Sequence, residues 1–429
     1  MSIGRIIYYH RRKQNKTQEQ LCQGICSVTH LSKIENNVKD ANPKTLQLLC
    51  ERLNISTEEE NRKSSQISRL LETFFDSMER LQKDSAQQLY KVLEKQKDYI
   101  QCTEMIYLYE LCRLRYMLMT NELGEFEQTA PQMKKYQSKF SPFELFLWDF
   151  LQGVYHGQKQ QFAQALSIHS RNEQKAELYQ TKVTDYYYYL SAVHGHLYHY
   201  SLSIHYAYKA LRVYQNSNNL LRIVYVKMIL AVNFIFIGEY EKSYEMLQLI
   251  LRDEEQLKDR EIRSLAYHNL GFLYFRRGQM KESLDNYAVA LKIKEPYSSS
   301  YYVTVACIAE TLISDHQHEK AVVLLKKELD HFYDEKSPQF IELKILYLEA
   351  LGNQKALINY LTKDGLAVLQ KYSSFTRGFK YLEMISSFYE DQKDFEKANH
   401  FLRLSTKHMK NLLFNIGSPI EPEKEVVKG

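Results

Sequence analysis

The residues best suited to specific chemistry lie in one short segment, Ser27 to Asn36, which reads SVTHLSKIEN. Threonine and histidine side chains form hydrogen bonds with base edges, and valine can contact a thymine methyl group. We therefore expect Val28, Thr29 and His30 to face the bases of a DNA major groove. Side chains that suit the phosphate backbone lie around them: Gln18, Ser27, Ser32, Lys33 and Asn36. An alternative for His30 is an ordinary solvated helix position.

Local helix signals place this segment on the second of two short helices. Thr17 with Gln20 three residues later predicts a capping box at the start of the first. A tight turn follows at Gly24, and Ser27 then caps the second helix. Two short helices joined by a tight turn describe a helix-turn-helix. A further helix is expected to open at Asn42 and Pro43.

The basic charge of the chain is concentrated in this region. Residues 1–56 hold nine Lys or Arg and four Asp or Glu, which accounts for the formal net charge of +5 of all 429 residues. A compact basic module ahead of a neutral body favours a nucleic-acid-binding head. Charge alone does not separate specific from non-specific binding.

The order of these motifs resembles a known family of DNA-binding heads. TQEQL, a short turn, SVTHLSKIEN and then NPKTLQLL follow the Xre/Cro-type pattern, with a turn one residue shorter than the commonest version. The run GICSVTHLSKIEN is most similar to the heads of PlcR- and NprR-like regulators. The resemblance implies a homodimer or higher oligomer on double-stranded DNA, with an inverted repeat as the target.

The segment after the head predicts a hinge. Residues 57–66, TEEENRKSSQ, contain no apolar side chain. An amphipathic helix is expected from about Ile67 to Asp98, with a break near Asp84 and Ser85. It could be a connector, a dimer contact or the first hairpin of the body, so we assign 57–98 to a hinge and linker helices.

From about residue 99 the chain repeats itself. A small residue early in the second helix of each repeat recurs in steps of 35–42 residues, at positions 129, 165, 203, 243, 283, 321, 356 and 398. Large-then-small pairs such as Leu270 and Gly271 let paired helices touch. This predicts an all-α chain in which the helix-turn-helix precedes a right-handed solenoid of about eight tetratricopeptide-like hairpins, over residues 99–415. Residues 416–429 are expected to be a flexible tail.

A helix-turn-helix joined to such repeats resembles the peptide-pheromone receptors of the Rap/Rgg/NprR/PlcR/PrgX group. The resemblance implies a short signalling peptide in the concave face and a cytoplasmic regulator of transcription, with activation as its expected sign. Asn233 and Asn269, on first helices of adjacent repeats, would hold peptide backbone. Further candidates on the same face are Tyr188, Lys227, His268, Phe272, Arg276 and Glu310. A structural bond to a neighbouring helix is the alternative for each asparagine.

The same family resemblance also allows a second function. The resemblance also implies an alternative function, a peptide-controlled inhibitor that binds a response-regulator protein and interrupts a sporulation phosphorelay. In that case residues 67–140 would be the binding surface and the head would be secondary. The two readings differ in their partner, since one requires DNA and the other requires a protein.

Other chemistry finds little support in the sequence. The six cysteines form no CxxC pair, and the run HGHLYHYSLSIH at 194–205 has four histidines but no acidic residue or cysteine among them, which disfavours zinc. No phosphate loop or nucleophile elbow is present. We expect no cofactor, no enzyme activity, no membrane span and no signal peptide.

Overall fold

The fold is described from a computed structural model that covers residues 3–36, 38, 42–332, 334–366 and 375–414. Every regular element in these ranges is helical. The chain divides into two compact units, residues 1–189 with 216–221, and residues 190–215 with 222–429. Within the described ranges, no helix is both long and apolar enough to cross a bilayer. The expected tail, 416–429, lies outside these ranges.

The head is built as the sequence predicts. Its helices are α1 (Ile3–Lys13), α2 (Gln18–Cys22), α3 (Val28–Glu35) and α4 (Pro43–Leu53). Thr17 and Gln20 form the capping box of α2, and the Ser27 hydroxyl accepts from the backbone N–H of His30 to cap α3. The apolar sides of these helices pack together in the core of the head, where Ile6, Leu31 and Leu49 are completely buried.

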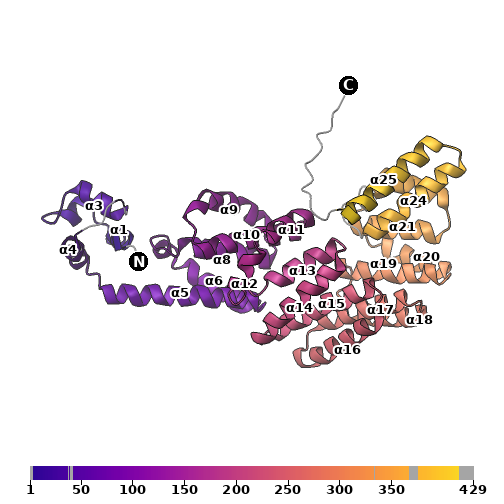
Figure 1. Cartoon of the computed structure of the whole chain (residues 1–429), viewed down its shortest axis with the longest axis horizontal. Helices are drawn as coiled ribbons and strands as arrows, with labels where there is room; N and C mark the ends of the chain where they lie inside the picture. Colours follow the sequence, from indigo (N-terminus) through magenta and orange to yellow (C-terminus); the bar gives the residue numbers. More distant parts are fainter. Residues whose placement is uncertain (1–2, 37, 39–41, 333, 367–374, 415–429) are drawn as a thin grey trace, which may run out of the picture. The chain divides into compact units, whose positions relative to one another are not determined.

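The expected hinge is the first part of a long helix. Helix α5 (Thr57–Glu79) takes in the whole polar stretch 57–66 (Figure 1). Ser56 accepts a hydrogen bond from the backbone N–H of Glu59, and three glutamates in the first turn suit the positive end of the helix dipole. Capping and charge therefore start the helix without any apolar periodicity. It ends at Glu79 with Arg80 as its C-cap, and Leu81 has a φ of 57°, so the break lies before the expected site at Asp84 and Ser85.

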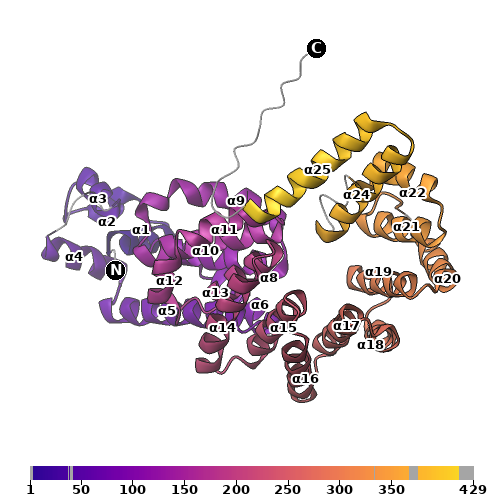
Figure 2. The same ribbon diagram turned by 45° about the vertical axis from the view of Figure 1, so that its right-hand side comes forward.

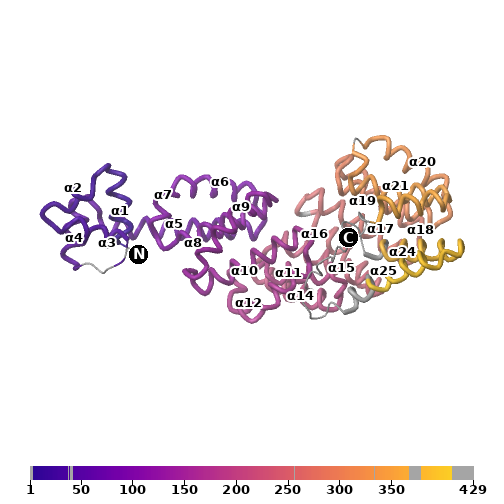
Figure 3. The backbone as a smooth tube through the Cα atoms, turned by 90° about the horizontal axis from the view of Figure 1, so that it is seen from above, coloured from indigo at the N-terminus to yellow at the C-terminus, as the bar shows by residue number. Residues whose placement is uncertain are grey.

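The core of the head continues into the helices that follow. One cluster of buried side chains runs from Ile6 through Ile67 and Phe74 to Tyr116. The head and the helices after it therefore share one core, and the expected boundaries at 56 and 98 stay predictions. The remaining helices of the first unit are α6 (Lys83–Glu94), α7 (Lys97–Ile100), α8 (Ile106–Thr120), α9 (Leu123–Lys135), η1 (Gln137–Lys139), α10 (Pro142–Gln158), α11 (Phe162–Ser170) and α12 (Glu173–Tyr179). Helix α7 lies between the head and α6, and it contacts α1 (Figure 3).

Helical hairpins make up the rest of the described residues. The helices are α13 (Tyr186–His196), α14 (Tyr200–Asn216), α15 (Leu220–Phe236), α16 (Tyr240–Leu257), α17 (Arg260–Arg276), α18 (Met280–Ile293), α19 (Ser299–Ser314), α20 (His318–Leu329), α21 (Pro338–Ala350), α22 (Gln354–Tyr360), η2 (Leu361–Gly365), α24 (Phe375–Asp391) and α25 (Phe395–Phe414). Figure 2 shows α17 beside α18 and α21 beside α22 within the second unit. All eight expected small positions fall in second helices, from α9 to α25, which confirms the repeat pattern.

Small residues allow the close helix contacts that the repeats require. A Cβ on Gly271 would lie 2.6 Å from the ring of Tyr287 on the paired helix. The hydroxyl of Ser283 donates to the carbonyl of Gly271, and Ser203 donates in the same way to Ser191, each pair twelve residues apart. The repeated spacing shows that one packing solution recurs along the array.

Candidate DNA and peptide interfaces

A buried ion pair joins α1 to the second helix of the helix-turn-helix, α3. The Nε and Nη2 atoms of Arg11 donate to the two carboxylate oxygens of Glu35 at 2.6 and 2.9 Å. Arg11 also donates to the carbonyl of Lys16 at 2.9 Å. Gln18 completes the site by donating to Glu35 Oε2 at 2.8 Å. Helices α1, α2 and α3 are therefore joined through one carboxylate.

The outward face of α3 is open for contact. Val28, an apolar residue, is 39% exposed, and Thr29 is exposed beside it. His30 is half-buried, so its imidazole is less available than the other two side chains. Among the expected phosphate contacts, Ser27, Lys33 and Asn36 are exposed and Ser32 is half-buried. The exposed set matches the face that we expect to enter a major groove.

The side chain of Gln18, which the sequence predicts to contact a phosphate, already forms a hydrogen bond within the head. Its side-chain amide is engaged with Glu35, so the NH2 group is not directed at a phosphate in this state. Its backbone N–H is at the first position of α2, where helix N–H groups have no intrahelical partner. A phosphate contact at Gln18 would therefore use the backbone.

Asn233 makes structural hydrogen bonds, and the peptide contact expected for it stays a prediction. It is 3% exposed on α15. Its Nδ2 donates to the hydroxyl of Ser203 on α14 at 2.8 Å and to the carbonyl of Ile229 at 2.9 Å. Both amide hydrogens are thus used inside the protein, and Asn233 joins neighbouring helices, as the structural alternative describes.

Asn269 is more accessible than Asn233. It is half-buried on α17, and its Nδ2 contacts the thioether sulfur of Met228 at 2.9 Å. A thioether is a weak acceptor, so a peptide carbonyl could replace it at little loss. Its neighbour His268 contacts the hydroxyl of Thr304 at 3.1 Å. Asn269 therefore remains a candidate for holding peptide backbone.

An aromatic ladder with a cation lies on α14, α15 and α17 of the second unit. The ring of Tyr200 stacks on Phe236 at 4.7 Å, and Phe236 meets Phe272 at 5.5 Å. The guanidinium of Arg276 lies 5.9 Å from the centroid of each phenylalanine ring. Arg276 is exposed, so its charge faces solvent above an apolar floor. This combination suits a carboxylate that lies next to an apolar group.

The other candidate peptide contacts are less well placed. The ammonium of Lys227 is paired with the Asp253 carboxylate at 2.5 Å. Glu310 is half-buried on α19. Tyr188 is half-buried with its ring edge against Tyr189, and it belongs to the first unit. Of the residues expected in this site, Asn269, Phe272 and Arg276 offer the most accessible chemistry.

The histidine-rich turn forms a pair of imidazoles. The Nδ1 atoms of His194 and His199 are 3.2 Å apart, and the ring of His194 stacks on Tyr206. Burial, and then the proximity of His199, lowers the pKa of His194 to about 4. In the residues that the structure describes, no three His, Cys, Asp or Glu side chains come together as a metal site.

Buried histidines predict acid sensitivity. Burial, and then the charge of Lys294, lowers the pKa of His268 to about 3, below its usual value of 6.5. A histidine that is neutral when folded and protonated when unfolded contributes stability above pH 6.5 that is lost as the pH falls towards the folded pKa. We expect His268 alone to account for about 1–2 kcal/mol of lost stability between pH 7 and pH 5. Urea unfolding of the wild type and His268→Gln at both pH values measures this, and an equal loss in both proteins would contradict it.

Comparisons with known proteins support both the helix-turn-helix head and the helical hairpins that follow it. Residues 7–59 match the helix-turn-helix family. The transcriptional activator NprA of Geobacillus stearothermophilus is 24% identical over 406 residues, which cover 92% of this chain and all of that protein. Response regulator aspartate phosphatase E of Bacillus subtilis is 22% identical over 287 residues, 64% of this chain and 76% of the relative.

Solved structures show the same fold at low sequence identity. A Rap protein complexed with competence and sporulation factor has a TM-score of 0.69 at 18% identity, covering 82% of this chain and 99% of that one. NprR in complex with its cognate peptide NprX has a TM-score of 0.65 at 21% identity, covering 80% and 98%. The expected architecture of a helix-turn-helix followed by stacked helical hairpins is confirmed.

Proposed function

We propose that this chain is a transcriptional activator of the Rap/Rgg/NprR/PlcR/PrgX group, whose DNA binding is controlled by a short signalling peptide. The observation that carries the proposal is the exposed α3 face on a head fixed by Arg11 and Glu35. The relative that matches over nearly the whole chain is an activator, so we place this chain with regulators and not with enzymes.

The head would read DNA through the N-terminal part of α3. Val28 and Thr29 are the side chains best exposed for base contacts, and Lys33 lies one turn further on for a phosphate. A dimer would place two such helices on an inverted repeat, with half-sites separated by about one or more helical turns. The protein would act in the cytoplasm, where its DNA target lies.

The peptide would bind along the first helices of the repeat region. The named complex of NprR with NprX supports a peptide ligand for the shared fold. In this chain Asn269 would hold a peptide backbone group and Arg276 a peptide carboxylate, with Phe272 beneath an apolar side chain. The peptide changes DNA affinity only by the difference in its affinity for the DNA-binding and the inactive states.

Substitutions on α3 separate base contacts from phosphate contacts. We expect Thr29→Ala to relax base preference at one position of each half-site by about 1–3 kcal/mol. Lys33→Ala should weaken binding to all sequences alike and reduce the salt slope by about one. Selection from random duplexes at two salt concentrations measures both effects. If Lys33→Ala altered the preferred sequence, our placement of α3 in the groove would be wrong.

Substitutions on α17 test the peptide site. We expect Asn269→Ala and Arg276→Gln each to weaken peptide binding by about 1–3 kcal/mol, since each removes one hydrogen-bonding group. DNA selection by the peptide-free protein should be unchanged. Calorimetry with short peptides encoded beside the gene measures the affinity, and Lys281→Gln on the exposed part of α18 is the control. Unchanged affinity in both variants would remove α17 from the site.

A second candidate function is binding of a response regulator. The relative that bears the name response regulator aspartate phosphatase is the observation that favours it. Sizing the full chain by light scattering, with and without peptide, and then selecting random duplex DNA distinguishes the two. A peptide that changes both mass and selected sequence supports the activator. Capture of a response regulator by a protein that selects no duplex supports the second function.

A further inference from the structure

One buried carboxylate connects the DNA-binding head to the helices behind it. Glu60, in the first turn of α5, is 6% exposed. Its Oε1 accepts from the Nε2–H of His10 on α1 at 2.8 Å. Its Oε2 accepts from the hydroxyl of Tyr99 on α7 at 2.6 Å. Three helices of the first unit therefore meet at one side chain.

A cation between two rings reinforces the same junction. Lys63, one turn after Glu60, lies with its ammonium 3.6 Å from the ring centroid of Tyr99 and 5.2 Å from that of Tyr9. The two rings meet edge to face at 5.2 Å. Tyr9 is adjacent to His10, so the same three helices, α1, α5 and α7, supply this second set of contacts.

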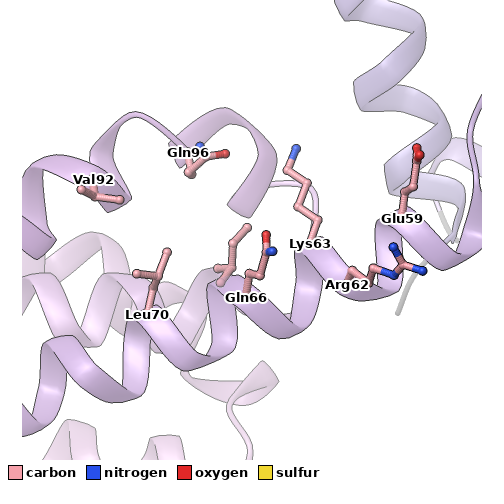
Figure 4. Close-up of a pocket in the computed structure, with 8 residues that line it drawn as sticks. Glu59, Arg62, Lys63, Gln66, Leu70, Val92 and Gln96 are labelled. Carbon is pink, nitrogen blue, oxygen red and sulfur yellow. The ribbon is translucent and has the colours of Figure 1, made fainter.

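The elements next to these contacts add little further support to the junction. Helix α5 and the segment from Val92 to Gln96 are separated by a cleft of about 370 Å³, and Lys63 stands at its edge (Figure 4). Helix α7 has only four residues, Lys97–Ile100. Burial and the adjoining Glu60 carboxylate raise the pKa of Tyr99, which keeps its hydroxyl as the donor. A buried carboxylate that loses one donor is costly, so the junction is held together or lost as a set.

We propose that Glu60 is a positioning residue that fixes the angle of the head on α5 and so determines which half-site spacing the dimer accepts. The inference rests on the proposed DNA-binding function. Each base pair added between half-sites turns one of them by about 34° around the duplex. A head held at one angle tolerates one spacing, whereas a head that pivots at α5 tolerates several. No contact of Glu60 with DNA is needed.

The test varies the spacer between two half-sites and keeps the half-site constant. The proteins are the full-length wild type, Glu60→Gln and Tyr99→Phe, with Glu59→Gln and Tyr107→Phe as matched controls outside the junction. We expect the wild type and the controls to prefer one spacing by about tenfold over spacers two base pairs longer or shorter. In the two junction variants this preference should fall below about threefold, while affinity for a single half-site stays within about twofold.

Amide exchange gives a reading that does not depend on DNA. We expect faster exchange in α7 and residues 57–66 of the junction variants, with α3 unchanged. Faster exchange with an unaltered spacing preference would overturn the proposal, as would a loss of single half-site affinity equal to the loss on the inverted repeat. A wild type that selects no duplex would overturn the proposed function itself, and amide exchange would still report whether Glu60 holds α1.

Discussion

Arg115→Met is expected to destabilise the first unit by about 3–5 kcal/mol. Arg115 is 1% exposed, and its Nη2 lies 2.5 Å from Asp185 Oδ2 and 3.7 Å from Glu79 Oε1. Glu79 in turn accepts from the Thr184 hydroxyl at 2.6 Å and the Asp185 N–H at 3.0 Å. The network joins the end of α5 to α8 and to the segment before α13. Removing its cation leaves two buried carboxylates facing each other.

The single tryptophan makes this measurable in the full chain. Trp148 on α10 is buried in the first unit, so its fluorescence during urea unfolding reports that unit. Arg62→Met is the control, because its partner Glu58 is 3.8 Å away and both side chains are exposed. Such surface pairs contribute about 0–1 kcal/mol. If Arg115→Met lowers the free energy of unfolding no more than the control does, Asp185 and Glu79 find other partners in the variant.

Local signals in the sequence are enough to predict the head and the repeats. Thr17, Gln20 and Ser27 act on backbone groups within three residues, so a cap can be recognised without knowing the rest of the fold. The small residue at 283 is equally local in effect, since its hydroxyl donates to Gly271 on the helix immediately before it. Repetition then makes the hairpin pattern visible at a fixed spacing.

Features that depend on distant partners could not be predicted. The stretch 57–66 lacks apolar side chains, and what buries Glu60 there is His10, 50 residues earlier, and Tyr99, 39 residues later. Asn233 is the same residue type as Asn269, but a serine 30 residues away occupies its amide. The type of a residue indicates what bonds it can make, and the fold decides whether those bonds are already used.

Glu35→Ala is expected to abolish DNA binding by unfolding the head, with a loss of about 3–5 kcal/mol. The Glu35 carboxylate is 1% exposed and is the shared acceptor for Arg11 and Gln18. Its removal leaves the Arg11 guanidinium buried without its carboxylate. Amide exchange of residues 3–53 and binding to a selected duplex measure the loss, and retained binding would contradict it.

The double variant Arg11→Met with Glu35→Leu distinguishes two roles for this pair. Replacing both ions by apolar groups of similar size avoids a lone buried charge, and such replacements are often neutral or stabilising. We expect the double variant to regain most of the protection in α1 and α3 that Glu35→Ala loses. If duplex binding also returns, the ion pair contributes mainly to the fold. If protection returns without binding, the bidentate geometry is needed to hold α3 at the angle that DNA requires, since a hydrophobic contact fixes no direction.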